Sequence, residues 1–280
     1  MTPIHDQSYR RYAGVRQPPG TAWLTIAQTG IRTVLAKKLF LLVLLAAWGQ
    51  FFVRAVTFYL AANFPNLEIL APSVETFRQF FEIQEIFVLF VTVYVGSGLI
   101  SNDRRSNALQ IYLSKPLSRV EYVAGKLATL VFFLILVTLA PALALLFLQM
   151  MFSASLAFVG ANLFLIPAIT LYALIEVLLS AFTMLALSSL TASARYTAML
   201  YAGVVLFTAA LFSVLFGITN GSGLAWLSFR ANLDQIGDVI FRLPPRFDSP
   251  WLVSVGVVLL LIGLSAVVLE RRVRGVEVVT

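Results

Sequence analysis

Glu176 is the side chain whose type and position most suggest chemistry, because it falls near the middle of the apolar run LYALIEVLLSAF. An ionisable group at that depth in a membrane costs several kcal/mol unless it faces protein or water, or is protonated. We therefore predict that Glu176 lies on a substrate path. The alternative is a structural contact that fixes helix packing, with Arg54 or the hydroxyls of Tyr172 or Ser180 as partners.

The residue types that usually carry catalysis are scarce in this chain. It has no cysteine, and its one histidine, His5, lies in a polar N-terminal segment, so thiolate chemistry and a histidine- or cysteine-bound metal inside the membrane are excluded. Ser97 in VGSGLI lacks the second glycine of a nucleophile elbow. No GxxxxGK[ST] sequence occurs, so the chain has no P-loop of its own for ATP. We expect no enzyme activity, no metal and no cofactor bound by this chain.

The composition indicates an integral membrane protein. Hydrophobic residues make up 60% of the chain and charged residues 12%, whereas a soluble domain has about 25% charged residues. The net charge of +7 could suggest nucleic acid as a partner. The basic residues fall in the gaps between apolar runs, however, as orientation in a bilayer requires, so we expect membrane lipid and no nucleic acid as a partner.

Six apolar runs are long enough to cross a membrane, since about 20 residues of helix span the hydrocarbon core. We predict an all-α fold with one transmembrane domain over residues 39–269, and a kink at Pro141 in its third span. The predicted spans are Leu39–Ala61, Ile83–Ile100, Leu127–Met151, Leu163–Leu187, Tyr196–Gly217 and Trp251–Leu269.

The segments outside the spans have their own patterns. Residues 1–20 form a polar tail, and residues 21–38 place Trp23 and Ile26 on one face of a helix with Arg32 opposite, which predicts an interfacial amphipathic helix. Residues 62–82 are rich in acidic residues and proline, so we predict an outside loop with a short helix. Residues 270–280 form a second polar tail.

The longest outside segment, residues 218–250, also has helical periodicity. Phe229, Leu233 and Ile236 recur at three- and four-residue steps, while Asp234, Asp238 and Arg242 face away from them. The pattern predicts an amphipathic or re-entrant helix at the outer surface, ended by the two prolines at 244–245.

The distribution of positive charge orients the spans. Fifteen lysines and arginines fall on the side of the two termini, and four fall on the other side: Arg78, Arg230, Arg242 and Arg246. Cytoplasmic segments carry the excess of basic residues, so we predict that both termini and the stretch Ser101–Lys126 are cytoplasmic.

The stretch Ser101–Lys126 divides into two helical pieces. Leu109, Tyr112 and Leu113 share one face at helical spacing, and Pro116 ends this piece. Ser118 and Glu121 form a capping box that opens the helix of the third span. A short surface helix hinged to a membrane helix can transmit a displacement by a partner protein to that membrane helix.

This stretch resembles the membrane subunits of ATP-binding-cassette transporters of the exporter-type permease family often called type two. That family typically shows an acidic residue, then Gly-Thr-Leu-Glu-x-Leu-Leu-Ser-Arg-Pro-Ile-Ser-Arg, and later Gly-Lys. In this chain Asp103 takes the acidic place, and Asn107-Ala108 stands where the family has Gly-Thr. The residues that match directly are Leu109, Leu113, Ser114, Pro116, Ser118, Arg119, Gly125 and Lys126.

The resemblance implies a permease of the bacterial inner (plasma) membrane that pairs with a second copy or a homologue and binds two separate P-loop ATPase subunits. ATP and Mg would be bound by those subunits, and the substrate, which stays unidentified, would be exported. Residues 104–115 would form the coupling helix, with Leu109, Tyr112 and Leu113 as its apolar anchor. The polar or turn-forming positions of this contact would be Asp103, Arg104, Arg105, Asn107, Gln110, Lys115 and Pro116.

Two other functions stay open from the sequence. One is a non-transporting membrane anchor that docks a cytoplasmic ATPase for envelope assembly or signalling. The other is a stand-alone secondary carrier or channel, which is disfavoured because the chain shows no internal repeat and few charges within its spans.

Overall fold

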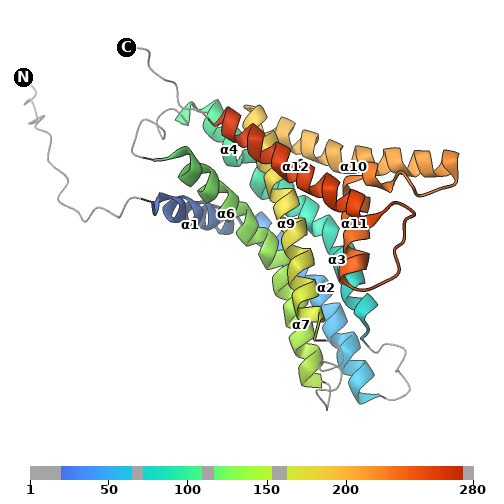
Figure 1. Ribbon diagram of the computed structural model, residues 1–280. Helices are drawn as coiled ribbons and strands as arrows, with labels where there is room; N and C mark the ends of the chain where they lie inside the picture. The colour runs from blue at the N-terminus through green and yellow to red at the C-terminus, as the bar shows by residue number, and fades with distance from the viewer. Residues whose placement is uncertain (1–19, 65–71, 109–116, 153–162, 274–280) are drawn as a thin grey trace, which may run out of the picture.

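The computed structural model describes residues 20–64, 72–108, 117–152 and 163–273 (Figure 1). Every regular element in these ranges is a helix, and six segments are long and apolar enough to cross a membrane. The predicted all-α class and the six spans are therefore confirmed. The spans are α2 (Lys38–Asn63); α3 (Val74–Val91), η2 (Thr92–Gly96) and α4 (Ser97–Arg105) in continuous succession; α6 (Arg119–Val137) with α7 (Leu139–Phe152); α9 (Leu165–Leu190); α10 (Ala194–Thr219); and α12 (Trp251–Arg272).

Helix α9 is the central element of the fold. It is apolar on all sides, as a helix enclosed by others must be, and its buried share of 56% is the highest of the six spans. It contacts α4, α6, α7, α10, α11 and α12. By contrast, α10 and α2 are only 6% and 11% buried, and α10 extends beyond the rest of the bundle (Figure 1). Most of the surface of α10 therefore has no partner within the described part of the chain.

The second span begins earlier than its sequence suggests. A capping box opens α3, in which the Thr76 amide donates to Ser73 Oγ at 3.3 Å and the Ser73 amide donates to Thr76 Oγ1 at 3.1 Å. The sequence predicts an outside loop with a short helix over 62–82. A helix does begin at Val74, but it is continuous with the second span rather than separate from it. The polar residues of this stretch resemble those of a loop, although one of them, Arg78, is buried against another helix.

The third span breaks where its proline predicts. Pro141 has no N–H to donate to the carbonyl of Val137, four residues earlier, so α6 ends there and α7 begins after one intervening residue. Gln84 Nε2 donates to this carbonyl at 2.6 Å, and Trp48 Nε1 donates to the Leu136 carbonyl at 3.1 Å. Side chains of α3 and α2 thus satisfy backbone acceptors that hydrocarbon would leave unpaired.

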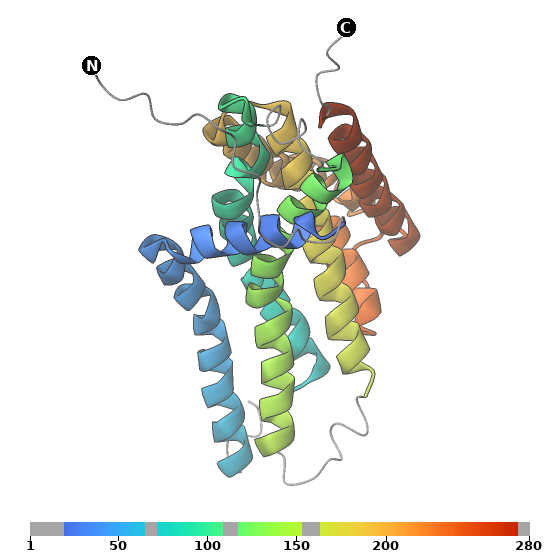
Figure 2. The same cartoon turned by 90° about the vertical axis from the view of Figure 1, so that its left-hand side faces the viewer.

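Helix α1 (Ala22–Leu35) forms within the range predicted for an amphipathic helix and lies across α6 (Figure 2). The crossing depends on Gly125, where a Cβ would approach Ile26 Cβ at 2.7 Å and the Trp23 carbonyl oxygen at 2.9 Å. Gly125 is one of the positions that match the family sequence. The close packing of α1 on α6 explains why glycine stands there. The placement of α1 at a membrane interface stays a prediction.

Helix α11 (Phe229–Ile240) corrects the prediction for the outside segment. Its apolar face is buried as expected, through Phe229, Leu233 and Ile236. Asp234 and Asp238, however, are only 8% and 1% exposed. They face a second helix rather than water, because α3 places an arginine opposite them. The helix is thus enclosed on both faces and is not a surface helix with a solvated polar side.

Replacing Gly125 with alanine should loosen α1 from α6, because the added methyl group overlaps Ile26 and the Trp23 carbonyl. Such overpacking costs about 1–3 kcal/mol. We expect faster tryptic cleavage at Arg32, which lies inside α1 and is protected while this helix stays folded. The matched control is Gly256→Ala, which meets no heavy atom within 4 Å. Equal cleavage rates for the two variants would contradict the packing role of Gly125.

Candidate functional site

One end of the bundle carries those residues of the family sequence that the structure describes, Asp103, Ser118, Arg119, Gly125 and Lys126. Asp103, on the last turn of α4, accepts a hydrogen bond from the Tyr122 hydroxyl at 2.7 Å and forms an ion pair with Lys126 Nζ at 2.7 Å. Asp103 and Lys126 are the acidic and basic ends of the matched sequence. Their contact joins the end of the second span to the start of the third.

The neighbouring arginines have different surroundings. Arg104 turns inward and donates through Nη1 to the Ser189 carbonyl near the C-terminal end of α9. The helix dipole also stabilises a cation at this position. Arg105 is exposed. Asn107 follows with a φ of +53°, a left-handed conformation that asparagine tolerates better than most residues. Of the two predicted arginine contacts, Arg105 is thus the one available to a partner.

The rest of the predicted coupling helix, Leu109, Gln110, Tyr112, Leu113, Lys115 and Pro116, lies outside the described residues. Its role stays a prediction. The capping box that follows is present: the Glu121 amide donates to Ser118 Oγ at 3.1 Å, and the Ser118 amide donates to Glu121 Oε2 at 3.1 Å. The sequence therefore located the start of α6 correctly.

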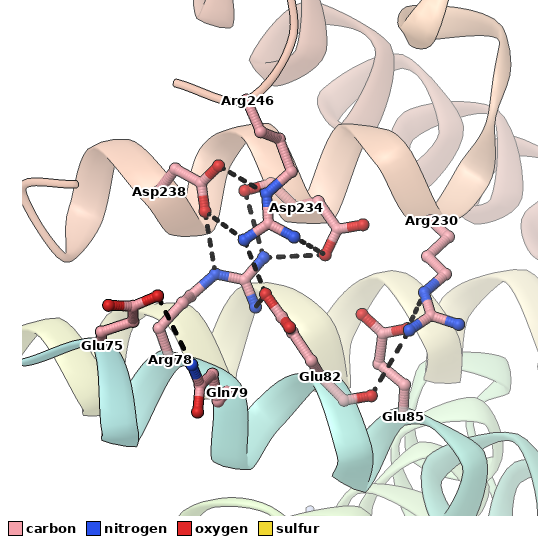
Figure 3. Close-up of polar contacts among 9 residues, drawn as sticks. All are labelled: Glu75, Arg78, Gln79, Glu82, Glu85, Arg230, Asp234, Asp238 and Arg246. Carbon is pink, nitrogen blue, oxygen red and sulfur yellow. Dashed lines mark hydrogen bonds and ion pairs between the residues drawn. The ribbon is translucent and has the colours of Figure 1, made fainter. Parts of the chain in front are cut away.

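A network of ion pairs occupies the opposite end of the bundle (Figure 3). Its centre is Arg78 on α3, whose side chain is 1% exposed. Arg78 Nη2 contacts Asp234 Oδ1 at 2.7 Å, and Arg78 Nε contacts Asp238 Oδ1 at 3.3 Å. Both aspartates come from α11, so a single guanidinium group links the second span to the segment between the fifth and sixth spans.

A second arginine closes the network from the loop after α11. Arg246 contacts Asp238 Oδ2 through Nε at 2.7 Å and Glu82 Oε1 through Nη2 at 2.6 Å. The loop itself is fixed by the Ser222 hydroxyl, which donates to Asp248 Oδ2 at 2.6 Å. This bond, with one from the Ser222 amide, holds the pKa of Asp248 below its usual range.

The close approach of α3 and α11 needs a glycine. A Cβ on Gly237 would lie 2.6 Å from Arg78 Nε and 2.8 Å from a ring carbon of Tyr172. The absent side chain leaves room for the guanidinium group, whose Cζ lies 5.1 Å from the centroid of the Tyr172 ring in a cation–π contact. The network is therefore packed on its apolar side by α9.

A cavity of about 250 Å³ lies beside this network, between α3, α9, α10 and α11. Glu176 lines it and is 1% exposed, and neither of its carboxylate oxygens has a hydrogen-bond partner among the residues that the structure describes. The structural alternative for Glu176 was a packing contact, with Arg54 or hydroxyls such as those of Tyr172 or Ser180 as partners. No such hydrogen bond is present among the described residues, although Ser180 lines the same cavity.

Sequence reasoning missed most of this end of the molecule. It placed Arg78 and Glu82 in an outside loop with a short helix and Asp234 and Asp238 on the polar face of an outer helix, and it did not single out Glu85. A signal was available, because Arg78, Glu82 and Glu85 recur at helical spacing and so share one face of a helix. Within the described ranges, no group of three or more histidine, cysteine, aspartate or glutamate residues could hold a metal ion.

Comparison with models of protein families gives a match. A family model described as "ABC-2 family transporter protein" matches residues 26–246, a range that contains five of the six spans in full. No curated protein matches the chain.

Replacing Arg78 with leucine should destabilise the protein strongly, because Asp234 and Asp238 would lose their buried cation. Breaking a buried ion pair costs about 3–5 kcal/mol, which corresponds to a fall of roughly 6–20 °C in the midpoint of thermal unfolding. Arg78→Lys should recover only part of the loss, because the single nitrogen of lysine cannot replace the two nitrogens with which Arg78 contacts Asp234 and Asp238. The midpoints are compared in detergent, with the exposed Arg271→Leu as control. A wild-type midpoint for Arg78→Leu would show that the network does not stabilise the fold.

Proposed function

The chain belongs to the ABC-2 family of transporter proteins, and from this premise we propose that it exports a substrate with energy from ATP hydrolysed by separate P-loop ATPase subunits. It is a multi-pass membrane permease. The residues of this chain would form the substrate path and the contact with the ATPase, whereas ATP and Mg²⁺ would be bound by the ATPase. The bacterial inner membrane is the location that we propose for it.

The observation that carries this proposal is the joint formed around Asp103. Because Asp103 bonds both Tyr122 and Lys126, the ends of α4 and α6 are held together on either side of residues 104–115. Arg104 extends the joint to the end of α9. A displacement of residues 104–115 by an ATPase would therefore reach three spans together rather than bend one loop.

The exposure of two spans supports pairing with a second permease. Helix α10 buries only Thr197 and Tyr201 of its own residues, and α2 buries only Phe40, Ala47 and Phe58. Their remaining apolar surface can face lipid or another copy of the chain. A dimer fits a transporter in which each permease docks one ATPase subunit.

The cavity that contains Glu176 supports a transporting role over a purely anchoring one. An anchor needs only a stable bundle, and a buried carboxyl group without a hydrogen-bond partner weakens such a bundle. We therefore place Glu176 on the substrate path.

Reversing the charge of Arg105 and Lys115 together should weaken assembly with the ATPase. Like charges across an interface cost several kcal/mol, so we expect the amount of ATPase that co-purifies with the permease to fall more than about tenfold. The measurement is ATP hydrolysis by the complex isolated from its native membrane through a tag on the permease. Arg271→Glu, exposed at the same end of the bundle, is the matched control.

Arg104 is left unchanged in this experiment, because its bond to Ser189 gives it a structural role. Deletion of residues 104–115 provides the stronger version of the test. Normal assembly of the deleted permease with its ATPase would contradict the proposed coupling contact.

A further inference from the structure

The cavity beside the ion network has an acidic lining and apolar walls. Three carboxyl groups line it, those of Glu82, Glu85 and Glu176, against one guanidinium group, that of Arg230. The apolar walls come from α3, α10 and α11, and they consist mainly of Ile86, Leu89, Val205, Leu206, Phe229 and Leu233. Binding sites for small molecules combine an apolar lining with a few placed polar groups in this way.

Two of the three carboxyl groups have unused oxygens. Both oxygens of Glu176 and Oε1 of Glu85 are buried and have no hydrogen-bond partner in the described part of the chain. Glu85 Oε2 is held by Arg230 Nε, and Glu82 is held by Arg246 (Figure 3). The acceptors that remain open therefore belong to Glu176 and Glu85, and both residues line the same cavity.

The nearby arginines are already engaged. Arg78 binds Asp234 and Asp238, and Arg246 binds Asp238 and Glu82. An unpaired carboxylate is costly in a low-dielectric interior, and a positive charge placed against it offsets that cost. Three arginines thus face five carboxyl groups, and the cavity is the space from which Glu176 and Glu85 can receive a further cation.

The size and walls of the cavity restrict the kind of cation. A volume of about 250 Å³ is the space of roughly eight water molecules at about 30 Å³ each. An inorganic ion would leave most of that space unfilled and would face apolar side chains. An organic ammonium ion with an apolar body would fill it, and the aromatic faces of Phe229 and Tyr201 could add cation–π attraction.

We propose that this cavity binds a lipophilic organic cation, whose ammonium group pairs with Glu176 and Glu85 and whose apolar part contacts α3, α10 and α11. Arg230 lies at the mouth, since its side chain is 50% exposed while that of Glu85 is 11% exposed. An entering ammonium group competes with Arg230 for Glu85. An anionic molecule of the same shape is rejected by the carboxylates.

The further statement that such a cation is the transported substrate rests on the proposed permease function. Binding itself does not require the ATPase. The two statements can therefore fail separately, and the first experiment measures binding alone.

The probe is benzyltrimethylammonium, and its uncharged isostere with carbon in place of nitrogen serves as the ligand control. Binding is measured by calorimetry on the purified full chain in detergent. We expect the cation to bind more tightly than the isostere, and benzenesulfonate not to bind. Equal binding of cation and isostere, or no binding of the cation, would overturn the proposal.

Variants assign the binding to the cavity. Glu176→Gln and Glu85→Gln should each weaken cation binding at least about tenfold, because each removes a negative charge while keeping nearly the same volume. The matched control is Glu75→Gln, an exposed carboxyl group on the same helix as Glu85. Unchanged binding by Glu176→Gln would reject the site.

A second variant covers the case in which removal of a carboxyl group disturbs folding. Ala209→Leu adds bulk to the cavity wall without changing its charge, and it should also weaken binding. Wild-type affinity in this variant would place the cation elsewhere. With binding established, failure of the cation to stimulate ATP hydrolysis by the assembled transporter would reject it as cargo and leave the binding site intact.

Discussion

The fold depends on the pairing of polar groups that cannot reach water, and Arg78 is the clearest case. Its side chain is among the largest fully buried ones of the described residues, and it joins α3 to α11 through Asp234 and Asp238. The same constraint governs the kink of the third span, where Gln84 binds the carbonyl that Pro141 leaves without a donor. In a hydrocarbon environment each such group needs a partner from the protein.

The two ends of the bundle are consequently built in different ways. The end that carries the matched family sequence uses a compact joint, in which Asp103 contacts two residues of α6 and Arg104 contacts the end of α9. The opposite end uses a network spread over α3, α11 and a loop. Helix α9 contacts both joints, the first through the Ser189 carbonyl and the second through the Tyr172 ring, so a single helix connects the two ends.

Glu176 departs from this pairing in both of its carboxylate oxygens, and this makes it informative. Arg78, Arg230 and Arg246 are bound by other carboxylates, and Glu176 lines a cavity with apolar walls while both of its oxygens are buried and unpaired. A protein that needed only a stable bundle would have gained from an apolar residue at this position. The unpaired carboxyl group is best explained by a ligand that supplies the positive charge.

The sequence by itself determined the elements that depend on local composition and spacing. Apolar runs fixed the six spans, Pro141 fixed the break in the third, and Ser118 with Glu121 fixed the start of α6, because each of these signals acts within a few residues of the chain. Only the tertiary structure decided which polar residues are buried. Arg78 and Asp234 lie in polar segments of the sequence, which predicts contact with solvent. In the structure they form an ion pair, because the pairing of distant helices determines whether a polar face meets water or an opposite charge.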